Sequence, residues 1–208
     1  MTNSALTIVE QAREIAAESI TSDEGVHLHA YPDSRSPMGL ALRQAGIDQI
    51  GRTGIVPASV EGLSGDPWTI GKGLTGPDIR RGTVWSQQHA DARFAEALVE
   101  YHDKAERAWP GMKTLHPAAQ AALISLAYNR GTSLKRDTKD PIDRRREMRE
   151  LVPAVVQRDY LRMAELIDAM TRIWAGEQQG GLLTRRKREA DLCRRAARET
   201  GATRRVIA

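Results

Sequence analysis

The sequence is poor in the residues that build disulfide scaffolds, aromatic cores and membrane spans. Its 208 residues include one cysteine, Cys193, so no disulfide can form within the chain and nothing indicates an oxidising compartment. No run of about 18 apolar residues occurs, which excludes a transmembrane helix of the usual kind. Aromatic residues make up 4% against 40% hydrophobic residues, which predicts a core of Ala, Leu, Ile and Val.

A chain of 208 residues is long enough to form one domain with a sizeable core, and we expect a single domain over residues 1–208. The first residues lack a basic region followed by an apolar core, so we expect no secretory signal. Residues 185–205 hold eight Arg and one Lys against three acidic residues. This basic C-terminal helix and tail, residues 184–208, could bind anionic wall polymers or outer-membrane lipid, although a solvated helix face explains it equally well.

Most of the chain has helical periodicity. Thr7 and Glu10 fit a capping box at the start of a first helix that runs toward Asp23. A second short helix, with Met38 and Leu42 on its apolar face, is expected before Gly46. Further helices are predicted after Ser86, from His116 to Gly131, and over residues 144–151, 159–170 and 184–200, with a polar surface loop over residues 132–143.

The first helix gives way to a strand at a glutamate. Gly25 ends the helix after Glu24, and from Val26 the hydrophobic period changes to two, as in a half-buried strand. Asp33 follows this strand, and Thr69 begins a second, glycine-rich one. Each residue taken alone favours a structural role, because a glutamate before glycine commonly ends a helix and an aspartate after proline commonly forms a turn. Together, two carboxylates and a hydroxyl in one cleft could cleave a glycosidic bond.

This ordered set resembles the phage-type lysozymes, the muramidase family of bacteriophage endolysins. In that family a helix ends in an acidic residue plus Glu-Gly, a strand ends in Tyr-x-Asp, and a second strand carries Thr-x-Gly-x-Gly. Residues 121–131 and 181–186 are also similar to the family, so the resemblance spans most of the chain. The matching motif residues are Asp23, Glu24, Gly25, Tyr31, Asp33, Thr69, Gly71 and Gly73.

The resemblance implies an α+β, lysozyme-like fold that is mostly helical. A small β-containing N-terminal lobe and a larger helical C-terminal lobe would flank the cleft. It also implies hydrolysis of the β-1,4 bond between N-acetylmuramic acid and N-acetylglucosamine in bacterial peptidoglycan, without a cofactor. Glu24 would be the general acid, and Asp33 and Thr69 would position a water that attacks the opposite face of the sugar.

Four further residues are candidates for binding the sugar chain. Tyr31 belongs to the Tyr-x-Asp motif, and Tyr128 and Asn129 lie where family members line the cleft. An amide such as that of Asn129 can both donate to and accept from a saccharide. Trp174 could offer an apolar platform for a sugar ring or belong to the core. The family pattern also places Arg185 near the catalytic glutamate.

The chain departs from the family pattern in three places. Lys72 and Leu74 replace a tyrosine and a histidine of the glycine-rich strand, which puts local packing in doubt. Residues 34–65 form an insertion between Asp33 and Thr69, which we interpret as a lid or an extra wall of the cleft. Because of this insertion, Asp66 competes with Asp33 as the catalytic base, and the Tyr-x-Asp context favours Asp33.

Other functions remain open on the sequence. A lysozyme-like antibacterial toxin would use the same chemistry, and a lytic transglycosylase would replace water by the sugar's own hydroxyl. His27 and His29 share a strand face, but a metal site there is the less favoured interpretation. Neither a helix-turn-helix signature nor interleaved basic and aromatic residues indicates nucleic-acid binding. We expect a monomer that waits in the host cytoplasm until a holin opens the membrane.

Overall fold

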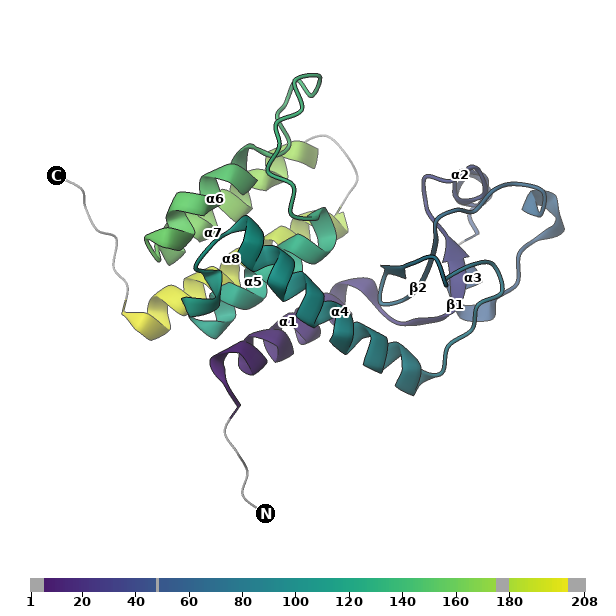
Figure 1. Cartoon of the computed structure of the whole chain (residues 1–208). Helices are drawn as coiled ribbons and strands as arrows, with labels where there is room; N and C mark the ends of the chain where they lie inside the picture. The colour runs from purple at the N-terminus through teal and green to yellow at the C-terminus, as the bar shows by residue number, and fades with distance from the viewer. Residues whose placement is uncertain (1–5, 48, 175–179, 202–208) are drawn as a thin grey trace, which may run out of the picture. The chain divides into compact units, whose positions relative to one another are not determined.

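The computed structural model describes residues 6–47, 49–174 and 180–201 (Figure 1). The chain divides into two compact units. The small unit is the continuous segment Glu24–Ala97, and the helical unit combines the residues up to Asp23 with those from Leu98 onward. All the strands of the described residues lie in the small unit. The predicted α+β class, mostly helical with one small sheet, is thereby confirmed.

The sheet of the small unit has three antiparallel strands in the order β1 (His27–Pro32), β2 (Trp68–Gly71) and β3 (Leu74–Thr75). The register pairs Tyr31 with Thr69 and Thr69 with Thr75, and it is irregular between His27 and Tyr31. The first two strands begin within one residue of the predicted starts at Val26 and Thr69. The two-residue β3 was not predicted, because so short a segment shows no alternation.

The insertion folds as short helices around the sheet. The predicted helix is α2 (Pro37–Gln44), and Ser36 caps it by accepting a hydrogen bond from Gly39 N at 3.0 Å. It is followed by α3 (Ile50–Thr53) and η1 (Ala58–Val60), neither of which was predicted. The buried residues of this unit form one apolar core, namely Ala30, Met38, Leu42, Ile50, Val60, Trp68, Ile70, Ile79, Trp85 and Ala90.

The remaining helices follow the predicted order. The helix over residues 87–108 begins in the small unit and ends in the helical unit. Capping hydrogen bonds confirm the expected starts: Glu10 N donates to Thr7 Oγ1, His89 N to Ser86 Oγ, and Arg162 N to Asp159 Oδ1. The elements are α1 (Ile8–Glu24), α4 (Gln87–Ala108), η2 (Met112–Thr114), α5 (Pro117–Arg130), α6 (Arg146–Val156), α7 (Tyr160–Ala169), η3 (Met170–Trp174) and α8 (Gly180–Thr200).

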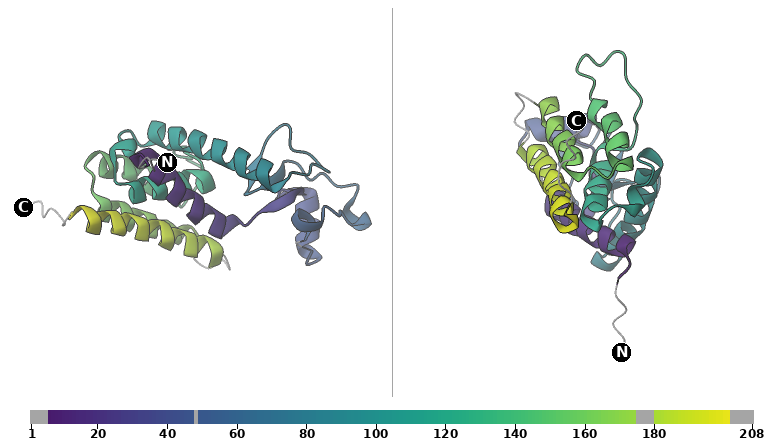
Figure 2. Two further views of the ribbon diagram at one scale, coloured as in Figure 1. Left: turned by 90° about the horizontal axis from the view of Figure 1, so that it is seen from below. Right: turned by 90° about the vertical axis from the view of Figure 1, so that its left-hand side faces the viewer.

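The core of the helical unit is centred on α5, whose residues 118–127 are all buried. Helix α8 packs against both α5 and α7, and α7 packs against α6 (Figure 2). Cys193 is fully buried, and burial raises the pKa of its thiol, as expected for a small core residue rather than a nucleophile. Within the described ranges no helix is long and apolar enough to cross a membrane.

Candidate active site

Glu24 is the last residue of α1. The next residue, Gly25, has a φ of +67°, in the left-handed region that favours glycine, and a Cβ added there would meet nothing within 4 Å. Backbone conformation rather than space therefore calls for glycine at this position. The preceding residue, Asp23, forms ion pairs with Arg188 and, at 3.6 Å, with Arg185 Nε of α8. The end of α1 is thus held by two arginines of the helical unit.

Asp33 follows β1 in a tight turn. Its Oδ1 accepts a hydrogen bond from Arg35 N at 2.7 Å, and its carbonyl accepts from the backbone and hydroxyl of Ser36. Its own N–H donates to the carbonyls of Gly65 and Pro67, each at 3.1 Å. The two ends of the insertion therefore close on Asp33, and the backbone fixes one carboxylate oxygen.

Tyr31 interacts electrostatically with both carboxylates. Burial first, and then the charges of Glu24 and Asp33, together raise its pKa to about 12. Both carboxylates therefore lie within electrostatic reach of the Tyr31 hydroxyl. Thr69, which is 9% exposed, is the cross-strand partner of Tyr31. The structure thus gathers all four predicted residues of the small unit around β1 and β2.

His27 completes the surroundings of Tyr31. The two rings meet edge to face with centroids 4.9 Å apart. Burial lowers the pKa of His27, and the charge of Arg52 lowers it too, while Glu24 acts in the opposite direction. Among the residues described, no group of three or more His, Cys, Asp or Glu side chains is placed to hold a metal ion.

Asp66, the competing base, lies in a different environment. It is exposed, precedes a cis peptide bond to Pro67, and its Oδ2 accepts a hydrogen bond from Ser64 Oγ at 3.3 Å. The carboxylates that act on Tyr31 are those of Glu24 and Asp33. Asp33, and not Asp66, is thus the second carboxylate whose charge raises the pKa of Tyr31.

The two departures in the glycine-rich strand are accommodated by packing. The Lys72 side chain is 11% exposed, with its Nζ 3.5 Å from Asp91 Oδ1 and 4.3 Å from the centroid of the Phe94 ring. Leu74 packs against the apolar core of the small unit. Lysine and leucine thus fill these positions with an ion pair and apolar contacts.

In the helical unit, Tyr128 and Asn129 lie at the end of α5. The Tyr128 ring packs against Tyr101 with centroids 4.8 Å apart. Asn129 Oδ1 accepts a hydrogen bond from Arg186 Nη2 at 3.0 Å. Because a guanidinium group only donates, this bond orients the amide and leaves its NH₂ group to donate elsewhere.

Arg185 belongs to a buried ionic cluster. Its other members, Ser125, Arg186 and Glu189, were not predicted as part of the site. Ser125 Oγ donates to Glu189 Oε1 at 2.7 Å, and Arg186 Nη2 donates to the same oxygen at 3.0 Å. Arg185 Nε lies 3.5 Å from it. Burial raises the pKa of Glu189 and lowers that of Arg186. The sequence does contain a sign of this cluster, because Glu189 follows Arg186 by three positions and Arg185 by four. This spacing places all three side chains on one face of the helix.

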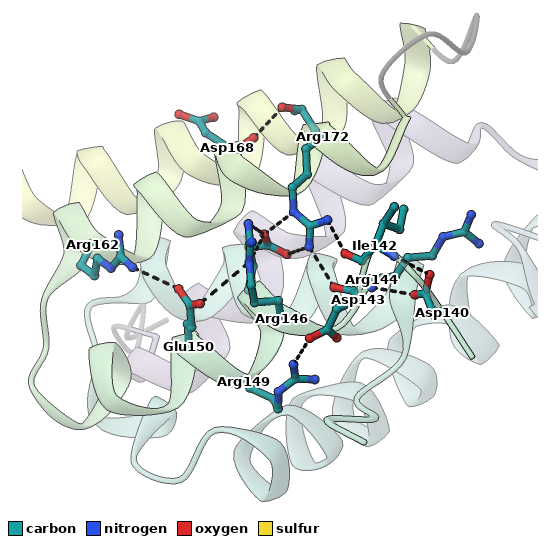
Figure 3. A network of polar contacts seen from close by, with 12 residues as sticks. Asp140, Ile142, Asp143, Arg144, Arg146, Arg149, Glu150, Arg162, Asp168 and Arg172 are labelled. Atoms are coloured by element: carbon teal, nitrogen blue, oxygen red, sulfur yellow. Dashed lines mark hydrogen bonds and ion pairs between the residues drawn. The ribbon is translucent and has the colours of Figure 1, made fainter. Parts of the chain in front are cut away.

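Trp174 lies at the end of η3, which a second ionic cluster anchors. Arg172 Nε donates to Glu147 Oε1 at 2.6 Å. Its Nη2 donates to the Asp143 carbonyl at 2.8 Å (Figure 3). The guanidinium of Arg130 lies 5.3 Å from the centroid of the Trp174 ring. Trp174 thus stacks with a cation, and the segment beside it is bound to α6 and to the loop before it.

The cations of α8 are largely paired within the helical unit. Arg194 pairs with Asp168 and Asp191, and Arg195 Nε lies 2.7 Å from Glu199 Oε1. These contacts fit the interpretation of a solvated, salt-bridged helix face. The rest of the predicted basic tail, residues 202–208, lies outside the described residues.

Comparisons with known proteins show a similar fold. The fold is similar to the crystal structure of the active form of the P1 phage endolysin Lyz, with a TM-score of 0.59 and 17% identity over 98% of this chain and 99% of that one. It is also similar to the muramidase domain of SpmX from Asticaccaulis excentricus, with a TM-score of 0.53 and 20% identity over 86% and 93% of the two chains. No curated protein sequence matches.

The sequence pattern of the family named Phage lysozyme matches residues 53–189, about two thirds of the chain. The matched range includes Thr69, Tyr128, Asn129, Trp174 and Arg185, whereas the segment that carries both carboxylates precedes it. Because the match covers more than half of the sequence, the chain belongs to the phage lysozyme family.

Proposed function

We propose that Glu24, Asp33 and Thr69 carry out the hydrolysis of peptidoglycan by this muramidase, at the β-1,4 bond between N-acetylmuramic acid and N-acetylglucosamine. The observation that supports these roles most directly is the cross-strand pairing of Tyr31 with Thr69, beside the turn that holds Asp33. The charges of Glu24 and Asp33, which both raise the pKa of Tyr31, agree with this placement. We further propose that the two units act as one catalytic domain.

The proposed reaction is a single displacement. The Glu24 carboxyl donates its proton to the glycosidic oxygen as the C1–O bond breaks. A water held by Asp33 and the Thr69 hydroxyl attacks C1 from the opposite face and gives its proton to Asp33, so the configuration inverts. Such a course requires about 6.5 to 9.5 Å between the two carboxyl groups. The turn that fixes one oxygen of Asp33 supports its use as a base of constant orientation.

We propose that Tyr31, Tyr128, Asn129 and Trp174 bind the sugar chain. Tyr31 would donate from its hydroxyl, which its raised pKa keeps protonated even in alkaline solution. The NH₂ group of Asn129, oriented through Arg186, would donate to a sugar oxygen, and Tyr128 and Trp174 would contact ring faces. Arg185 would act by fixing Asp23, the residue before the general acid. In this proposal the enzyme is stored in the host cytoplasm and causes lysis after holin-dependent release.

The deciding experiment compares Glu24→Gln and Asp33→Asn with Asp66→Asn, an exposed carboxylate in the same unit. Loss of a general acid or base is expected to lower kcat roughly 10²- to 10⁴-fold in the first two variants. Asp66→Asn should stay close to wild type. Full activity of Glu24→Gln on purified peptidoglycan would refute the assignment. Mass spectrometry of the fragments should show hydrated reducing ends, whereas anhydro sugars would indicate a transglycosylase.

A further inference from the structure

The insertion creates a pocket in the small unit. The cavity has a volume of about 390 Å³ and is lined mainly by Tyr31, Leu42, Arg43, Ile47, Ile50 and Gly51. We call it the insertion pocket. Its volume lies in the range of about 300 to 1,000 Å³ that small-ligand sites occupy. It therefore has the size of a binding site for a short molecular segment.

Two glycines let the insertion approach β1 closely enough to form this pocket. A Cβ at Gly51 would lie 2.6 Å from His27 Nδ1 and 3.0 Å from Tyr31 Cδ1. A Cβ at Gly39 would lie 2.0 Å from the carbonyl oxygen of Asp33. The wall of the pocket is thus packed against the residues that hold the proposed catalytic base.

The lining has an apolar part and a cationic part. Leu42 and Ile50 are each 4% exposed and form an apolar floor with Ile47. Arg43 lines the pocket with an exposed guanidinium, whose Nη2 donates to the Ser34 carbonyl at 2.9 Å. This bond uses one of the donors of the guanidinium and limits where the charge can point. The pocket therefore suits a ligand that combines small apolar groups with an anion.

We propose that the insertion pocket binds the peptide stem of peptidoglycan, with a stem carboxylate at Arg43 and alanine methyl groups on the apolar floor. The inference rests on the proposed function, since it concerns the same substrate. A glycan offers dense hydroxyl and amide groups and suits an apolar floor poorly, whereas the stem alternates alanines with carboxylate-bearing residues. The stem is attached to the lactyl group of N-acetylmuramic acid, which is one of the two sugars joined by the scissile bond.

The test measures kcat/KM on two substrates, glycan strands with their stems and the same strands after an amidase has removed the stems. We expect the wild-type chain to prefer the stem-bearing strands and Arg43→Gln to lose about tenfold on them alone. The matched control is Arg80→Gln, an exposed arginine of the small unit that does not line the pocket. It should behave as wild type on both substrates.

A binding measurement separates this proposal from the catalytic one. The free stem peptide, which contains no glycosidic bond, is titrated against the wild-type full chain by calorimetry or NMR, and Arg43→Gln should weaken its binding about tenfold. Equal kcat/KM of the wild type on both kinds of strand, or unchanged peptide binding by a folded Arg43→Gln variant, would overturn the pocket assignment. Failure of the proposed catalytic roles would appear instead as an active Glu24→Gln variant on either substrate.

Discussion

At the residue scale, the position of the proposed acid depends on a glycine with open space around it. Gly25 has φ +67°, a conformation that costs an L-residue roughly 1 to 2 kcal/mol. Any side chain at this position would favour a different backbone turn between Glu24 and β1. The glycine therefore determines where the chain leaves the helix.

We predict that Gly25→Ala lowers the free energy of unfolding by about 1 kcal/mol and also lowers kcat, because relaxation of the backbone moves Glu24. The matched control is Gly62→Ala, since a Cβ at Gly62 also meets nothing within 4 Å and its φ is not positive. Urea denaturation and turnover of both variants test the prediction. Equal stability and activity of the two would show that the Gly25 conformation has no functional role.

Single residues also show where sequence reasoning stops. Glu24, Asp33 and Thr69 could be named because their spacing matches a motif, and the structure places them around two paired strands. Glu189 could not be predicted as a buried residue, because an acidic residue within a basic helix commonly lies on a solvated face. Its burial depends on Ser125, a residue 64 positions earlier in the sequence. Periodicity within a single helix carries no information about such a partner.

At the element scale, the end of η3 depends on one buried carboxylate. Burial raises the pKa of Glu147, but the hydrogen bonds from Arg172, from its own backbone N–H and from Arg146 together lower it below the ordinary value. Glu147 is 1% exposed, and Arg172 joins it to the loop that ends at Asp143 (Figure 3). Loss of this charge would remove the ion pair that joins η3 to α6 through Arg172.

We predict that Glu147→Gln lowers the free energy of unfolding by about 2 kcal/mol at pH 7. Because the folded-state pKa lies below 4.5, the contribution is present above that pH and is lost as the pH falls through the folded-state pKa. Wild-type stability should therefore fall more steeply with acid than that of the variant.

Glu14→Gln, at an exposed position of α1, is the control for this measurement and should follow the wild-type pH curve. Denaturation curves between pH 3 and pH 7, roughly one unit or more on either side of the ordinary glutamate pKa, cover the necessary range. Parallel curves for the wild type and Glu147→Gln would contradict the prediction.

Most helices could be predicted because capping residues and periodicity are local signals. The exceptions have tertiary causes. Helix α6 continues through Pro153 to Val156, beyond the predicted end at Leu151, since Ala154 and Val155 are buried. Helix α3 forms in a glycine-rich segment because its glycine packs on His27 and Tyr31. In both helices the outcome depends on contacts with distant residues in the core. A prediction from neighbouring residues in the sequence does not include such contacts.

At the scale of the whole molecule, the formal net charge of +4 understates how thoroughly the charges are paired. Arg188, Arg194 and Arg195 of α8 each contact a carboxylate. Exposed pairs of this kind contribute little stability, but they reduce the field that a distant polyanion would sense. Attraction of the described part of α8 to anionic wall polymers should therefore be weak.

We predict that the double variant Lys187→Gln and Arg198→Gln, at exposed positions of α8, leaves the salt dependence of wall lysis nearly unchanged. Lysis rates on purified walls, measured over a range of ionic strength, test this prediction. The same measurements on Arg43→Gln serve as a comparison with a variant outside α8. A clearly flatter salt dependence of the double variant would show instead that α8 contributes to wall binding.

The division of the chain has a consequence for its synthesis. The small unit is one uninterrupted segment, Glu24–Ala97, so all its internal contacts become available once that segment has left the ribosome. Helix α1 is different, because Asp23 pairs with Arg185 and Arg188 near the opposite end of the sequence. A nascent polypeptide therefore carries its first helix without these partners until α8 emerges. We expect lytic activity to arise only after that late event, which would protect the translating cell from its own product.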